Sequence, residues 1–153
     1  MQRMIAHHAQ ALVMTDLLTT RTAREDVRLL GQRIEVSQKD ELASMQSWLR
    51  QHGAEIPDPQ AHYHMAAGHM SLMPGMLTDK ELATLAAATG TDFDRLFLEY
   101  MIRHHNGAIT MVKDLFATNG AAQDTQIFRF AADVDADQRA EIQRMDTLLR
   151  QIK

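Results

Sequence analysis

The 153-residue sequence contains no cysteine, three prolines and few aromatic side chains. Without cysteine the chain can form neither a disulfide nor a thiolate metal site, which suits an oxidising compartment without identifying one. Aromatic residues make up only 5%, so a stacking platform for nucleic-acid bases is not expected. A formal net charge of −4 also argues against nucleic-acid binding, which requires a basic face. No apolar run approaches the roughly 20 residues of a membrane-spanning helix.

Methionine and histidine are abundant instead, with 11 and 8 residues. Methionine is a flexible side chain that fills irregular gaps in apolar cores. Its thioether is also a soft ligand that favours Cu(I), while imidazole binds several transition metals including copper. The positions of these residues therefore decide between a structural and a metal-binding interpretation.

Apolar residues recur with helical spacing through most of the chain. The pattern predicts helices over about 1–20, from a capping box at Thr22–Glu25 to Gly53, from a second box at Thr78–Glu81 to Gly90, from Thr91 to about 119, and over about 122–152. Short turns near residues 21 and 120 make the long helices antiparallel in pairs. We predict an all-α, single-domain four-helix bundle with a first hairpin at 1–53, a linker at 54–90 and a second hairpin at 91–153.

One phrase of the sequence occurs twice, first from Met4 and again from Met101, with a constant offset between the matching residues. Met4, His7, His8, Ala11 and Met14 match Met101, His104, His105, Ala108 and Met111. The following helices match as well, with Glu41, Met45 and Leu49 corresponding to Glu141, Met145 and Leu149. This self-similarity predicts two duplicated halves related by a pseudo-twofold axis.

Each consecutive histidine pair falls on or beside the apolar stripe of its helix. A buried imidazole needs hydrogen-bond partners or a metal ion, and both explanations stay open here. Glu41 and Glu141 lie at matching positions on the partner helices. Each carboxylate could orient a metal-bound histidine, act as a ligand, or form a purely structural hydrogen bond with it.

The predicted linker carries a further group of potential ligands and no obvious core pattern. Thioether and imidazole together suit copper, whereas the alternative is an amphipathic lid over the bundle. The candidate metal ligands are His7, His8, His104, His105, Met4, Met14, Met101, Met111, Met45 and Met145 in the helices, and His62, His64, Met65, His69, Met70, Met73 and Met76 in the linker. Glu-x-x-His pairs, which mark di-iron bundles, are absent, because Ser44 and Arg144 occupy the relevant positions.

The phrases "MIAHHAQALVM" and "FDRLFLEYMIRHHNGAITM", the "MPGM" before a short capped helix, and the Glu-x-x-x-Met helices resemble the bacterial family catalogued as domain of unknown function 305. The resemblance spans essentially the whole chain. It implies a ferritin-like bundle, a location outside the cytoplasm (periplasmic, secreted or lipid-anchored), and copper binding through methionine and histidine.

The favoured hypothesis is therefore a non-enzymatic protein that binds copper, as Cu(I) or Cu(II), or Ag(I), for sequestration or tolerance, with a copper-handling protein as its partner. A second hypothesis is a ferritin-like metal-dependent oxidoreductase in which Glu41, Glu141 and Glu99 join the histidines. A third is a metal-free structural or interaction module whose histidines are simply hydrogen-bonded.

Overall fold

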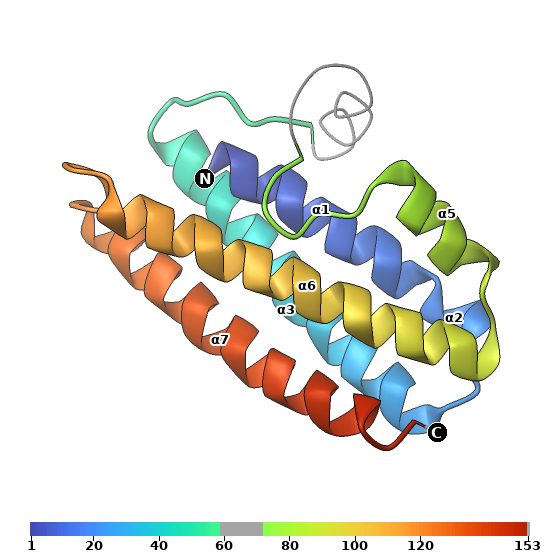
Figure 1. Ribbon diagram of the computed structural model, residues 1–153. Coiled ribbons are helices and arrows are strands. Elements are labelled where there is room, and N and C mark those ends of the chain that lie inside the picture. The colour runs from blue at the N-terminus through green and yellow to red at the C-terminus, as the bar shows by residue number, and fades with distance from the viewer. Residues whose placement is uncertain (59–71, 153) are drawn as a thin grey trace.

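The computed structural model describes residues 1–58 and 72–152, and the regular secondary structure of these residues is entirely helical. The helices are α1 (Gln2–Asp16), α2 (Leu18–Arg21), α3 (Glu25–Gln51), α5 (Asp79–Ala87), α6 (Gly90–Ala117) and α7 (Thr125–Leu149). The four long helices α1, α3, α6 and α7 lie side by side as a bundle (Figure 1). This confirms the predicted fold class.

Two antiparallel hairpins make up the bundle. In the first, α1 packs on α3, and in the second, α6 packs on α7; contacts of α1 with α6 and of α3 with α7 join the two. The N-terminus, the end of α3 and the α6–α7 turn lie at one end of the bundle, and the C-terminus lies at the other (Figure 1). Because α1 and α6 run in opposite directions, the start of α1 faces the end of α6.

Capping explains where two of the helices begin. Thr78 and Glu81 form the predicted capping box of α5, in which the Thr78 hydroxyl accepts from the Glu81 amide and the Glu81 carboxylate accepts from the Thr78 amide. The box predicted at Thr22–Glu25 is wrong. Helix α3 begins only at Glu25, so Thr22 lies too far upstream, and its hydroxyl accepts from the Arg24 amide within the turn.

Other helix ends differ from the predicted ends by a few residues. The first predicted helix is interrupted at Leu17, which separates α1 from α2. Helix α5 ends at Ala87, and Gly90, with φ of +59°, begins α6 instead of ending the preceding helix. Asp124 caps α7 through the amides of Gln126 and Ile127, so this helix begins three residues later than predicted.

Apolar side chains from all four long helices fill the centre of the bundle. The largest cluster includes Phe93, Phe97 and Leu98 of α6 with Ile34 of α3. A smaller cluster near the N-terminal end joins Ile5 to residues of α3. None of the helices in the described part of the chain is both long and apolar enough to cross a lipid bilayer.

Candidate metal centre

Four histidines are buried where α1 crosses α6. The exposed fractions of His7, His8, His104 and His105 are 0%, 0%, 1% and 0%. The rings of His7 and His104 lie with their centroids 3.9 Å apart. The two consecutive pairs, distant in sequence, therefore meet in one cluster in the core, as their helical spacing predicts.

The outer histidine of each pair donates a hydrogen bond to a buried glutamate. His8 Nε2 lies 2.5 Å from Glu41 Oε2, and His105 Nε2 lies 2.6 Å from Glu141 Oε2. An ionised carboxylate can only accept, so the proton of this contact resides on Nε2 of each imidazole. Glu–His hydrogen bonds, one of the alternatives left open by the sequence, are thus present, and each leaves Nδ1 as the remaining nitrogen of the ring.

The inner histidines have fewer partners. His7 Nε2 donates to the Pro74 carbonyl oxygen at 2.9 Å, whereas neither ring nitrogen of His104 makes a hydrogen bond of good geometry, although the ring also interacts with the His7 backbone. Burial, together with the neighbouring His8, lowers the pKa of His7 to about 3. Burial likewise holds the pKa of His104 well below its usual 6.5, with His7 adding to the effect. Both imidazoles are therefore neutral at pH 7.

The Nδ1 atoms of all four histidines are buried without a hydrogen-bond partner. In each consecutive pair the ring centroids lie 6.3 Å apart with an interplanar angle of 57°. Burying unpaired nitrogens is unfavourable unless something binds them. The unpaired Nδ1 atoms make these histidines candidate metal ligands.

Residues 72–77 form a strap over α1 and α6 that supplies the Pro74 carbonyl. The Gln10 side chain donates to Leu77 O at 3.0 Å and accepts from Leu77 N at 2.7 Å, which fixes the strap to α1. On α6, a Cβ added at Gly107 would lie only 1.9 Å from the Pro74 oxygen. The glycine therefore permits the close approach of the strap to the helix.

Sequence reasoning did not assign a role to Gln10, Gly107 or the Pro74 carbonyl. A glutamine three residues after His7, on an otherwise apolar stripe, was one available signal. The glycine two residues after His105 was another. The "MPGM" phrase lies in the strap, where Met76 is buried and Met73 is half-buried.

The methionines of the helices divide into two groups. Met14, Met101 and Met145 are fully buried in the large apolar cluster, and Met45 is fully buried in the smaller one. Met4 and Met111 are only half-buried. His62, His64, Met65, His69 and Met70 lie outside the described residues.

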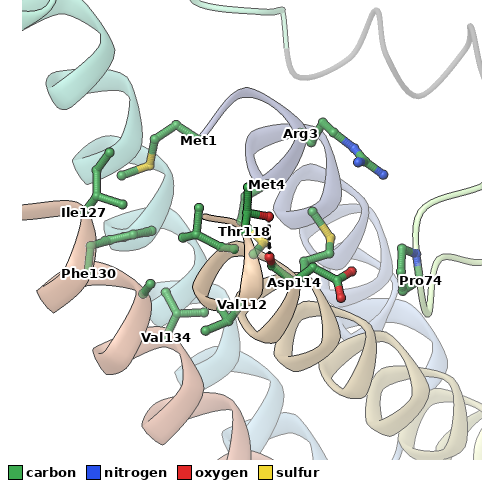
Figure 2. A pocket seen from close by; sticks show the side chains of 13 residues that line it. Met1, Arg3, Met4, Pro74, Val112, Asp114, Thr118, Ile127, Phe130 and Val134 are labelled. Carbon is green, nitrogen blue, oxygen red and sulfur yellow. Dashed lines mark hydrogen bonds between the residues drawn. The ribbon is translucent and has the colours of Figure 1, made fainter. Parts of the chain in front are cut away.

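Met4 and Met111 line a pocket of about 310 Å³ between the start of α1, the end of α6 and the start of α7 (Figure 2). Met1 and Pro74 also line it, with Phe130 and Val134 on the α7 side. We call this cavity the thioether pocket. It is the place where predicted methionine ligands reach the surface of the described structure together.

A hard-metal centre of the di-iron type is not favoured by these positions. No three His, Asp or Glu side chains of residues 1–58 and 72–152 are arranged to hold a metal ion together. Glu99, which the oxidoreductase hypothesis requires, is exposed on α6. A site made of only two imidazoles needs fewer ligands than such a centre.

The family model described as "Domain of unknown function (DUF305)" matches residues 1–149. The chain belongs to the DUF305 family. None of the curated protein sequences matches it. The family resemblance drawn from the doubled histidine phrase is thereby confirmed.

Solved structures of DUF305 proteins share this fold. A DUF305 fragment from Deinococcus radiodurans is 31% identical, with a TM-score of 0.81 over 98% of this chain and 92% of that one. A DUF305 protein from Streptomyces coelicolor, predicted to be secreted, is 28% identical, with a TM-score of 0.81 over 98% and 90%. CopM, solved in its Cu(I)-bound form, is 23% identical with a TM-score of 0.74 over 98% and 92%, and was also solved with Cu(II). At this identity the likeness to CopM concerns the fold.

Proposed function

We propose that this DUF305 protein binds copper as Cu(I) in the core of its bundle, for sequestration or transfer outside the cytoplasm. The observation that carries the proposal is the set of four buried Nδ1 atoms without hydrogen-bond partners. Each consecutive pair, His7–His8 and His104–His105, offers two such nitrogens to one ion. The same ligands would accept Ag(I), which is also monovalent and soft.

The surroundings of the histidines favour a monovalent ion. The inner imidazoles are neutral because burial lowers their pKa. The core around the histidines is largely apolar, and the cost of burying a charge rises steeply with its size. Cu(I) readily accepts two-coordinate nitrogen ligation, whereas a divalent ion requires more ligands. CopM, a structural relative solved with Cu(I), supports copper as the metal.

Glu41 and Glu141 act in this proposal through the histidines. By accepting the Nε2 protons of His8 and His105, the carboxylates hold the tautomer that leaves Nδ1 free. They also bring negative charge near the ion without contacting it. The Pro74 carbonyl performs the same orienting role for His7.

The methionines packed in the apolar clusters are assigned to the core in this proposal. Met14, Met101 and Met145 have apolar neighbours on the described helices, and Met45 has its own cluster. A location outside the cytoplasm is supported by the absence of cysteine and by the predicted secretion of the Streptomyces relative. A copper-handling protein would be the partner that supplies or receives the ion.

Replacing His104 by leucine separates a ligand from a structural histidine. Because the His104 ring makes no hydrogen bond of good geometry, the His104→Leu substitution should largely keep the stability of the metal-free protein. It should nevertheless remove at least half of the bound Cu(I). The measurement is titration of anaerobic apo-protein against a chromophoric Cu(I) chelator, with urea unfolding as the stability assay.

His52→Leu is the matched control. His52 is exposed, stacks on Trp48 and lies away from the core histidines, so its replacement should leave Cu(I) binding unchanged. If His104→Leu binds as much Cu(I) as the wild type with the same affinity, the proposed site is wrong. Equal losses in both variants would place the copper at surface histidines.

A further inference from the structure

The lining of the thioether pocket suits a soft metal ion better than a hard one. Its charged side chains are Arg3 and Asp114, and neither guanidinium nor carboxylate is a good ligand for Cu(I). Most of the remaining lining is apolar, from Val112, Phe130 and Val134 among others. The thioether sulfurs of the methionines are therefore the preferred ligands for Cu(I) within the pocket.

The two ends of the histidine cluster differ although their sequences match. Met4 and Met111 come from α1 and α6 at one end, and Met14 and Met101 come from the same helices at the other. Met14 and Met101 are fully buried among apolar side chains. Met4 and Met111 are half-buried and line the pocket instead. Of these two pairs, only Met4 and Met111 are therefore placed to meet an ion from solvent, beside Met1, which also lines the pocket.

The pocket adjoins the proposed copper site. Met4 precedes His7 by three residues, so the two side chains share a helix face and lie about 4.5 Å apart along the axis. Pro74 belongs to both places, since it lines the pocket and its carbonyl accepts the hydrogen bond from His7. One helical turn and the edge of the strap thus separate the pocket from the buried imidazoles.

We propose that the thioether pocket is a loading site, in which Cu(I) binds Met4 and Met111 before it passes to the histidines. A bond from sulfur to copper forms as the carrier's ligand leaves, and a bond from histidine nitrogen to copper then forms as the sulfur leaves. Copper remains Cu(I) throughout, and no proton or electron is exchanged with the protein. The pocket volume of about 310 Å³ exceeds that of a bare ion and leaves room for a ligand side chain of the protein that delivers it.

This inference rests on the proposed function, but it is tested by the rate at which Cu(I) enters the protein and not by the amount of Cu(I) bound. The test is a Met4→Leu/Met111→Leu double variant, because leucine keeps the apolar volume and removes the sulfur. Cu(I) held by a small chromophoric chelator is mixed with excess apo-protein, and transfer is followed by stopped-flow absorbance. We expect loading to slow about tenfold or more, the effect of about 1.4 kcal/mol on the barrier, with a much smaller change in the Cu(I) bound at equilibrium.

A Met14→Leu/Met101→Leu double variant is the matched control, since it removes two thioethers at the corresponding positions of the sealed end. It should load at the wild-type rate. Wild-type loading in the Met4/Met111 variant, or equal slowing in both variants, would overturn the loading site while leaving the histidine site intact. If the wild-type protein binds no Cu(I), the proposed function fails and this inference fails with it.

A second readout reports on the pocket directly. Methyl NMR of methionine-labelled protein at substoichiometric Ag(I) should shift the Met4 and Met111 signals early in the titration, while the Met14 and Met101 signals follow only as the core fills. Simultaneous shifts of all four signals would contradict a separate loading step.

Discussion

Acidification should destabilise the metal-free protein because neutral imidazoles are buried at its centre. In the unfolded chain histidine has a pKa near 6.5, whereas in the folded protein the pKa of His7 is about 3. Below pH 6.5 the unfolded chain therefore binds a proton that the folded protein does not. The free energy of unfolding is fully maintained above pH 6.5 and falls as the pH drops toward 3.

The size of this effect follows from the shift. Each pH unit below 6.5 costs about 1.4 kcal/mol for one such histidine. Between pH 7 and pH 5, His7 alone should therefore lower the free energy of unfolding by about 2 kcal/mol. The lowered pKa of His104 acts in the same direction. Such a loss is a large fraction of the roughly 5–15 kcal/mol that stabilises a typical domain.

A comparison of the wild type with the His7→Gln variant isolates this contribution. Both proteins are unfolded in urea at pH 7 and pH 5 with a chelator present, and unfolding is followed by far-UV circular dichroism. Glutamine cannot titrate, and its amide can still donate to the Pro74 carbonyl. The wild type should lose about 2 kcal/mol more than the variant on going from pH 7 to pH 5. Equal losses in the two proteins would show that His7 is not held neutral in the core, and would refute the reasoning.

Two further substitutions test the parts that hold the histidines. Gly107→Ala should lower the melting temperature, because the new Cβ would lie 1.9 Å from the Pro74 oxygen. Gly31→Ala should lower the melting temperature less, because its Cβ meets only the end of a flexible leucine side chain. The opposite order would contradict a strap held against α6. Glu141→Leu should cost about 1–3 kcal/mol in urea unfolding because it leaves the buried His105 Nε2–H unpaired, whereas Glu141→Gln, which keeps an acceptor, should cost less; equal costs would contradict that role.

The sequence was informative about features that depend on the periodicity of a single helix or on the pairing of neighbouring helices. The 3.6-residue spacing placed both consecutive histidine pairs on buried faces, and all four are buried. The matching positions of Glu41 and Glu141 made a hydrogen bond with histidine one of the open alternatives, and the structure contains these contacts. Short turns between long helices predicted the antiparallel hairpins. Each of these inferences needed only local periodicity and the pairing of neighbouring helices.

The sequence was less informative about the strap, because its contacts join residues far apart in the chain. His7 to Pro74 and Gln10 to Leu77 each span 67 positions. No local pattern reveals that a proline carbonyl approaches an imidazole, or that a glycine on another helix makes room for it. The misplaced capping box at Thr22–Glu25 has a different cause, since a correct motif does not form where the turn already uses the threonine hydroxyl.

The methionines show most clearly how spacing and environment divide the information. Met4 and Met101 occupy matching positions in the two copies of the repeated phrase, and so do Met14 and Met111. The sequence alone therefore predicts the same role for the two members of each pair. Helical spacing fixes the face on which a side chain lies, but the neighbouring helices decide whether that face is sealed. The large cluster seals Met14 and Met101, while the pocket leaves Met4 and Met111 half-buried. One phrase can therefore supply core packing at one end of the histidines and line a pocket at the other. If the proposed loading site is correct, this difference separates how tightly copper is held from how fast it arrives.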